Sequence, residues 1–333
     1  MPERVLTGVS APLRGAPAAG SRRKPPAEPG SPDDVVYPTR AGCGRPVMGR
    51  SHVASGWCSG ALAGYLIGLP PAGVVGFGCV TAGASALNDL DHDDSSASRV
   101  LGPVSALLAE LVQAYARWVY RVTRGPGDPR RKGAHRGATH SLPLLPVPCA
   151  ALAALPWLMS GLGRWLSAVV GWDEGIVYWI APVSVAAVIV FCVLVAADRL
   201  GRRMLVGAGF AAGGLMAGQG GMSQDGVLSA WAAGLVSVAP WVALAVLIGT
   251  VTHVLGDLVT EAGLYAFAPL YRVRVGTDQE RRWVRVALPK WLAFKTNGWF
   301  EQGVVFPVLT VCAVLLVPGM WPLAVELARA VSG

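Results

Sequence analysis

The sequence predicts an all-α protein: a polytopic transmembrane helical bundle of about six to seven spans, with an amphipathic helix at the cytoplasmic membrane interface. Three observations predict this. Hydrophobic residues make up 53% of the 333 residues and charged residues only 14%, whereas soluble domains carry about 25% charged residues. The apolar residues gather in long uncharged stretches, as membrane spans do. Lysine and arginine concentrate in every second segment that connects these apolar stretches.

The N-terminal segment differs in composition from the rest. Residues 1–47 are rich in Pro, Gly, Ala and Arg and have few large apolar side chains, so we expect a disordered tail. Residues 48–333 form the membrane domain, and Met48 is a candidate for the biological start. No secretory signal is visible, because the first apolar segment begins only near residue 53.

Seven apolar segments are candidate spans. The first two form a close pair broken at Pro70–Pro71, and each reaches only about 26 Å at about 1.5 Å per residue. They are therefore either two short spans or one hairpin. The fifth segment is apolar but rich in glycine. In chain order the segments are 53–69, 72–88, 141–160, 176–197, 204–223, 228–252 and 303–325.

The positive charges orient these spans. If the spans alternate across the membrane, all of the 28 lysines and arginines except Arg164 and Arg329 fall on one side. Loops with excess Lys and Arg face the cytoplasm, so we expect a multi-pass protein of the inner (plasma) membrane with a cytoplasmic N-terminus. The same rule explains the net charge of +8 without a nucleic-acid partner, which would need basic and aromatic residues interleaved in one soluble domain.

One loop carries the pattern of an amphipathic helix. Polar and basic side chains, among them Arg117 and Arg121, lie off an apolar stripe. Such a helix either lies in the membrane interface or packs its stripe against the spans. The stripe consists of Leu101, Val104, Leu108, Leu111, Tyr115, Trp118 and Val122.

The cysteines indicate neither a disulfide framework nor a thiolate zinc site. None of the six is paired at C-x-x-C spacing, and most lie in apolar segments. We expect them to be small packing residues.

The histidines share one location. All five fall at ends of apolar segments that the Lys/Arg topology puts at the cytoplasmic edge, and most stand in motifs with an aspartate or a second histidine. Because the topology came from Lys and Arg alone, this agreement is an independent check. Imidazole and carboxylate together are the ligands of zinc, manganese or iron sites. The predicted metal ligands are His52, Asp89, Asp91, His92, His135, His140, His253 and Asp257.

The spacing of these residues suggests roles. His253 and Asp257 are one helical turn apart, so either both bind the metal or Asp257 orients His253. Eight candidate ligands are more than one tetrahedral site can take, so we expect one or two divalent ions, zinc or manganese. Some of the eight side chains would then orient a metal ligand instead of binding the ion. Asp89 and Asp257 are the candidate catalytic carboxylates. Arg136 suits a phosphate or carboxylate of a substrate, or a lipid headgroup.

Two further positions have local roles. Thr139 or Ser141 is predicted to cap a helix that begins near Pro143. Glu301, just before the last span, is a helix N-terminal carboxylate favoured by the dipole.

These motifs resemble the YdjM-type (DUF457) family of inner-membrane proteins described as metal-dependent hydrolases. The resemblance runs from about residue 49 to 305 and is most specific at H-R-G-A-T-H-S, His135 to Ser141. Asn88 stands where the family has a proline, and Ser51 where it has a threonine. The matching positions are Ser51–His52, Asn88-Asp89-Leu90-Asp91-His92, His135 to Ser141, His253 with Asp257, and Thr296, Gly298 and Glu301, with Asn297 inserted.

The resemblance implies a membrane-bound metal-dependent hydrolase acting at the cytoplasmic face. We expect its substrate to be phosphorylated or lipid-linked and the bilayer to be its partner. Two alternatives stay open: a non-enzymatic metal-binding protein (a sensor, transporter or scaffold), and a metal-independent lipid phosphatase. The phosphatase class needs an arginine before its nucleophilic histidine, and the stretch before His253 has none. A transporter needs ionisable groups at mid-membrane, and here they cluster at one edge.

Overall fold

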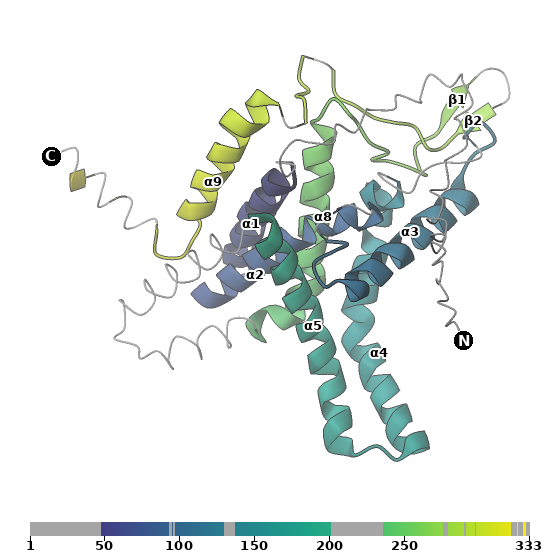
Figure 1. Ribbon diagram of the computed structural model, residues 1–333, viewed down its shortest axis with the longest axis vertical. Helices are drawn as coiled ribbons and strands as arrows, with labels where there is room; N and C mark the ends of the chain where they lie inside the picture. The colour runs from purple at the N-terminus through teal and green to yellow at the C-terminus, as the bar shows by residue number, and fades with distance from the viewer. Residues whose placement is uncertain are drawn as a thin grey trace, which may run out of the picture. The chain divides into compact units, whose positions relative to one another are not determined.

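The computed structural model of the protein is drawn in Figure 1. It describes residues 48–92, 95, 97–129, 137–200, 236–275, 279–289, 291–296, 298–320, 325 and 329–330, all within the unit formed by residues 46–333. The predicted disordered tail 1–47, the candidate span 204–223 and the two site residues His135 and Arg136 lie outside the described residues.

The first two helices form a hairpin. α1 spans Met48–Leu66 and α2 spans Pro71–Ala84, and the chain breaks at Pro70–Pro71 because proline at the first helical position begins a new helix. The helices approach closely, since a Cβ at Gly60 would lie 2.6 Å from the Thr81 side chain. The hairpin brings the end of α2 beside the start of α1, the part of α1 that carries His52.

Short turns connect this hairpin to the next one. The 3-10 turn η1 (Leu87–Asp91) precedes α3 (Pro103–Thr123), which confirms the predicted amphipathic helix. Two more 3-10 turns, η2 (Ala138–His140) and η3 (Leu142–Leu144), lead into α4 (Pro146–Val170) and α5 (Glu174–Leu200). α4 ends at Gly171, whose φ of 71° is the left-handed conformation of a helix C-cap. Figure 1 shows α4 and α5 side by side.

The helix α8 lies at the centre of the described helices. The turn η4 (Ala239–Trp241) precedes it, and α8 itself spans Val242–Leu258. It packs against α1, α2 and α4. Gly249 is needed for this contact, because a Cβ there would lie 2.4 Å from the carbonyl oxygen of Thr81 in α2. The close packing fixes the C-terminal end of α8 against the neighbouring helices.

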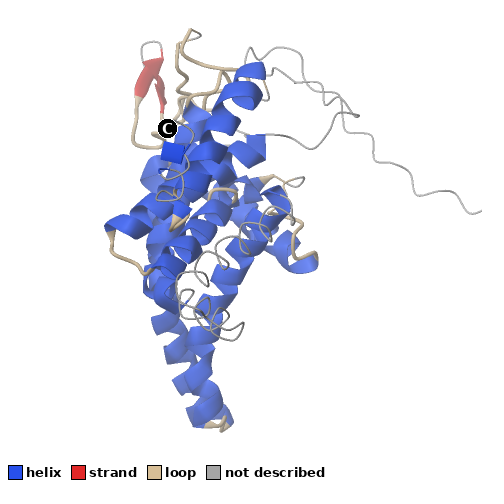
Figure 2. Cartoon of the chain, turned by 90° about the vertical axis from the view of Figure 1, so that its left-hand side faces the viewer, coloured by secondary structure: helices blue, strands red, loops and turns tan. Residues whose placement is uncertain are grey.

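The C-terminal part departs from a purely helical fold. β1 (Val273–Val275) and β2 (Gln279–Arg281) form an antiparallel hairpin, the red arrows of Figure 2. The sequence indicated only a basic loop here. Asp128 holds the hairpin, because its carboxylate accepts hydrogen bonds from the backbone N–H groups of Gly125, Arg282 and Trp283. The π-helix η5 (Glu301–Val305) then leads into α9 (Phe306–Leu315).

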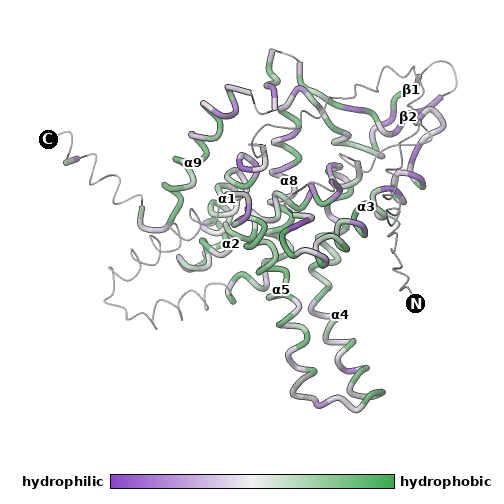
Figure 3. The backbone as a smooth tube through the Cα atoms, viewed as in Figure 1, coloured by the Kyte–Doolittle hydropathy of each residue, from purple (hydrophilic) through white to green (hydrophobic). Residues whose placement is uncertain are grey.

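Three helices among the described residues are long and apolar enough to cross a membrane. They are Leu142–Val170, Val177–Asp198 and Val236–Leu258, which correspond to three of the seven predicted spans. Figure 3 shows α5 and α9 largely in green, the colour of hydrophobic residues. The helical segment Glu301–Leu315, which contains α9, is apolar but too short to count as a candidate span. α1 and α2 lie on the predicted segments 53–69 and 72–88 and are 19 and 14 residues long. The structure therefore supports a helical membrane protein, but it does not confirm the predicted six to seven spans.

Candidate metal centre

Four elements from distant parts of the chain bring histidines and aspartates together. Two side-chain hydrogen bonds hold these elements in place: Ser85 Oγ donates to the carbonyl oxygen of His52 at 2.8 Å, and Asn88 Nδ2 donates to that of Thr250 at 3.1 Å. They tie α2 to α1 and the η1 region to α8. Of the predicted ligands, α1 supplies His52, η1 supplies Asp89 and Asp91, η2 supplies His140, and α8 supplies His253 and Asp257.

Asp257 lies between three imidazoles. Its Oδ1 atom is 3.4 Å from Nε2 of His52. Its Oδ2 atom is 3.5 Å from Nε2 of His140 and 3.7 Å from Nε2 of His253. The predicted pair His253–Asp257 therefore shares one face of α8, and Asp257 contacts two more histidines that the spacing alone could not assign to it.

The imidazoles also contact one another. His140 Nε2 and His253 Nε2 are 3.1 Å apart, and the His52 and His253 rings stack with their centroids 4.1 Å apart. Two nitrogens at this distance are satisfied either by one shared proton or by one shared cation. All three histidines are buried, so protein groups or a bound ion must satisfy their nitrogens.

The arrangement fits a divalent cation. Nε2 of His52 is buried and makes no hydrogen bond of good geometry, although Oδ1 of Asp257 lies 3.4 Å away. A poorly satisfied polar atom away from water is costly. Imidazole nitrogens and carboxylate oxygens are the donors that zinc and manganese take. Two sets of three ligand atoms each lie within 4.8 Å of one another: His52, His253 and Asp257, and Asp89, His140 and His253.

Asp91 reaches His140 through a threonine. Thr139 Oγ1 donates to Asp91 Oδ2 at 2.6 Å and lies 2.9 Å from His140 Nδ1. A hydroxyl has one proton to donate, and here it goes to the carboxylate, so toward Nδ1 the Thr139 oxygen must accept. Nδ1 of His140 therefore carries the proton, and the lone pair of Nε2 points toward Asp257 and His253. Such outer partners fix the tautomer of metal-binding histidines.

Asp89 marks the open side of the centre. Its Oδ1 atom is 3.7 Å from Nε2 of His253, and its side chain is 22% exposed. The other members of the two ligand sets expose 7% or less of their side chains. Water or a substrate group therefore reaches the centre most directly beside Asp89.

Two predicted ligands stand apart from the two sets. Asp91 contacts His140 at 3.7 Å but belongs to neither set, and His92 is exposed and belongs to neither. Asp91 is the last residue of η1, and His92 follows the turn in an extended conformation. The capping prediction was wrong: the turn η3 has no side-chain cap. Thr139 bonds Asp91 instead, and Ser141 Oγ donates to the carbonyl oxygen of Ala268.

Three residues near the centre have roles that the sequence did not predict. Gly256 faces His52, since a Cβ there would lie 2.8 Å from the ring carbon Cε1. Only glycine lets that ring lie against α8. Ser51 Oγ donates to Oε1 of the buried Glu301 at 2.8 Å, which joins η5 to the residue beside His52. Gly256 was not among the residues named from the sequence. Ser51 was named only as the residue beside His52 in the family motif, and Thr139 only as a possible helix cap.

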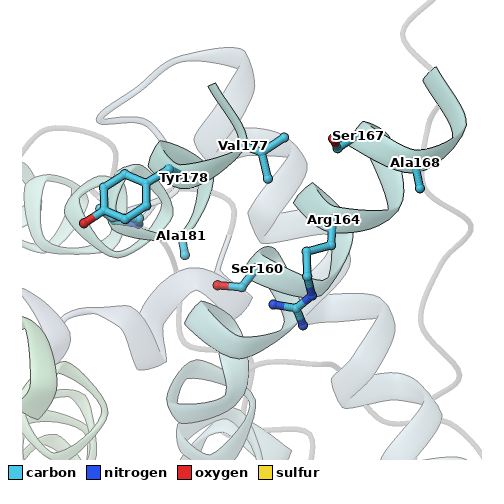
Figure 4. A pocket seen from close by; sticks show the side chains of 8 residues that line it. Ser160, Arg164, Ser167, Ala168, Val177, Tyr178 and Ala181 are labelled. Carbon is cyan, nitrogen blue, oxygen red and sulfur yellow. The ribbon is translucent and has the colours of Figure 1, made fainter. Parts of the chain in front are cut away.

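A separate pocket lies between α4 and α5. It has a volume of about 600 Å³, and Figure 4 shows the side chains of Arg164 and Ser160 beside each other on α4. None of its lining residues belongs to the His/Asp sets. The pocket therefore contributes nothing to the candidate metal centre.

Comparison with known proteins gave one match. A family model described as YdjM inner membrane protein matches residues 47–323, which include every described candidate ligand. No curated protein and no solved structure matches the chain.

Proposed function

This chain belongs to the YdjM inner membrane protein family, and from that premise we propose that it is a membrane-bound, metal-dependent hydrolase. Its ion would be zinc or manganese, bound singly or as a pair. Its substrate would be phosphorylated or lipid-linked, and the reaction would take place at the cytoplasmic face of the inner membrane.

One observation carries the proposal. The buried carboxylate of Asp257 lies 3.4 to 3.7 Å from Nε2 of His52, His140 and His253. Imidazole nitrogens and carboxylate oxygens that converge in a buried site are the ligands that a divalent cation takes. A divalent ion in such a site lowers the pKa of bound water and polarises a phosphoryl or carbonyl oxygen.

The side chains have distinct roles in this proposal. His52, His140, His253 and Asp257 would hold the ion, while Thr139 and Asp91 keep Nε2 of His140 free of a proton. Asp89 lies at the exposed edge of the centre, so its carboxylate is placed to accept a proton from an attacking water. Asp257 contacts three imidazoles, which favours the ligand role over the catalytic one. Arg136 stays the predicted partner of an anionic substrate group.

The membrane topology is part of the proposal. We expect six to seven spans and a cytoplasmic N-terminus, because nearly all lysines and arginines then fall on one side. All candidate ligands share that side. A hydrolase with this topology meets substrates made in the cytoplasm or carried in the inner leaflet.

A non-enzymatic metal protein is the second candidate. The burial of His52, His140, His253 and Asp257 is typical of closed structural sites. The partial exposure of Asp89 favours an open, catalytic site. The metal-independent phosphatase fits less well, because the contacts of His253 among described residues are with histidines and aspartates rather than arginine.

Elemental analysis of the purified protein tests the proposal. We expect wild type and His92→Ala to hold zinc or manganese and His253→Ala to have lost it, because His92 is exposed outside the centre. A panel of phosphoesters and carboxylic esters, assayed with each metal, then tests for hydrolysis. Equal metal content in wild type and His253→Ala refutes the metal centre. Metal bound without hydrolysis supports the non-enzymatic candidate, and activity that resists chelators supports the phosphatase.

A further inference from the structure

The helix α3 has three different faces. A protein-facing side is buried, and it consists of Ser105, Ala109, Ala116, Val119 and Tyr120. At about 100° per residue, a polar side with Arg117 and Arg121 lies about a third of a turn away from it. Between these two faces runs an apolar stripe that keeps five members of the predicted one and adds Leu107, while the predicted member Tyr115 is partly buried against the protein. Its members are each 38 to 59% exposed: Val104, Leu107, Leu108, Leu111, Trp118 and Val122.

The exposure of this stripe decides between the two readings that the sequence allowed. A stripe that packed against the spans would be buried, and instead a different side of α3, which contains Ala109, Ala116 and Tyr120, faces the protein. Six exposed large apolar side chains on one helix face are far more than isolated surface residues. The stripe therefore needs a partner other than the described part of this chain.

The charges around the stripe identify a lipid surface as that partner. Arg117 and Arg121 are exposed on the polar side of α3, and Arg124 follows the helix. An apolar stripe bordered by arginines is the pattern of helices that lie in the headgroup region of anionic membranes. Figure 1 shows α3 running obliquely to α4 and α5, both of which contain candidate spans, so α3 does not follow their direction through the bilayer.

α3 also supports the metal centre. It contacts η1 and η2, the turns that carry Asp89, Asp91 and His140. Ala109 packs in one apolar cluster with Leu90 of η1, and Ala116 packs in another with Ala138 of η2. The depth of α3 in a membrane therefore sets the height of these turns above the acyl chains.

We propose that α3 lies in the membrane interface with its apolar stripe among the acyl chains, and that the substrate of the metal centre is an amphiphile of the bilayer with a phosphate-containing headgroup. This substrate class rests on the proposed hydrolase function. The headgroup would enter beside Asp89, the exposed member of the ligand sets, while the acyl chains stay in the membrane beside α3.

Fluorine NMR tests the position of α3 in the whole protein. The chain is labelled with 5-fluorotryptophan and reconstituted in nanodiscs of phosphatidylglycerol and phosphatidylethanolamine, and the Trp118 signal is assigned as the one absent from Trp118→Phe. We expect a doxyl-labelled lipid to broaden this signal. If the lipid label leaves it sharp, the proposal is overturned. In that case a soluble gadolinium chelate identifies what covers the stripe. Broadening of the Trp118 signal by the chelate means that water covers it, and a sharp signal means that a second copy of the chain does.

Hydrolysis by two matched variants tests the substrate class. Leu111→Gln places an amide on the stripe, and Ala106→Gln places the same amide at an exposed position on the polar side. We expect Leu111→Gln to reduce hydrolysis of a phospholipid in vesicles about tenfold, since one apolar side chain leaves the acyl region. It should leave a short-chain soluble phosphoester unaffected, and Ala106→Gln should affect neither.

The failures of the two proposals are distinguishable. Equal losses on soluble and vesicle substrates, or none on either, overturn the lipid substrate while hydrolysis itself stands. If metal-loaded wild type hydrolyses no substrate, the hydrolase proposal fails and the lipid substrate fails with it. The fluorine signal of Trp118 still reports the position of α3 in that case.

Discussion

The contact of Thr139 with Asp91 and His140 gives the sharpest prediction. Thr139→Val keeps the shape of the side chain but removes the hydroxyl that donates to Asp91 Oδ2 at 2.6 Å and accepts from His140 Nδ1 at 2.9 Å. The imidazole then loses the group that fixes its tautomer. Nε2 of His140 becomes protonated in part of the population and is no longer free to bind an ion.

The size of the effect follows from these contacts. A hydrogen bond to a charged group contributes about 1.5–3 kcal/mol. Asp91 has a further partner, so the loss falls at the low end of that range. About 1.4 kcal/mol corresponds to a factor of ten, which agrees with the 10- to 100-fold cost, roughly, of removing the outer partner of a metal-binding histidine. We therefore expect Thr139→Val to bind zinc about tenfold more weakly than wild type.

Competition with a chromophoric zinc chelator, on protein in detergent, measures this affinity. Thr139→Ser is the matched control, because it keeps the hydroxyl and should bind within about twofold of wild type. Thermal unfolding of each variant checks that the fold is intact. Wild-type affinity in a folded Thr139→Val protein, or equal weakening in Thr139→Ser and Thr139→Val, would refute the reasoning.

Three other predictions concern the centre and its support. Gly256→Ala puts a methyl group 2.8 Å from Cε1 of His52 and should weaken zinc binding in the same chelator competition, whereas Gly161→Ala, with no atom within 4 Å of the added Cβ, should not. Removing the metal by dialysis against a chelator should lower the melting temperature, and zinc or manganese should restore it, because an ion that binds only the folded state stabilises it; an unchanged melting temperature contradicts a bound ion. Burial, and then the nearby Asp128, raise the pKa of Tyr120 from 10.0 to about 12. The unfolded state therefore loses this proton first, and the contribution of Tyr120 to stability is complete below pH 10 and lost between pH 10 and about 12. Unfolding in denaturant across this range should show a larger loss in wild type than in Tyr120→Phe.

The sequence was sufficient to predict most of the described helices and the residue types of the candidate metal centre. Long apolar runs and breaks at proline or glycine are local signals, so α1, α2, α3, α4 and α5 lie on their predicted segments. The ends of the later helices differ: α8 extends to Leu258, beyond the predicted end at residue 252, and α9 ends at Leu315, before the predicted end at residue 325. The spacing of His253 and Asp257 is also local, because one helical turn separates them. The motifs were sufficient to identify the family, which the match over residues 47–323 confirms.

Only the tertiary structure decided how the candidate ligands divide. Whether a side chain reaches the centre depends on how α1, η1, η2 and α8 pack, and that depends on close contacts such as those of Gly60 and Gly249, which no motif records. Packing joined Asp257 to His52 and His140, made Thr139 the link between Asp91 and His140, and left His92 exposed. It also buried the side of α3 that contains Ala109, Ala116 and Tyr120 and left the apolar stripe exposed. A helical pattern shows that two faces differ, but only the neighbours of a helix determine which face is covered.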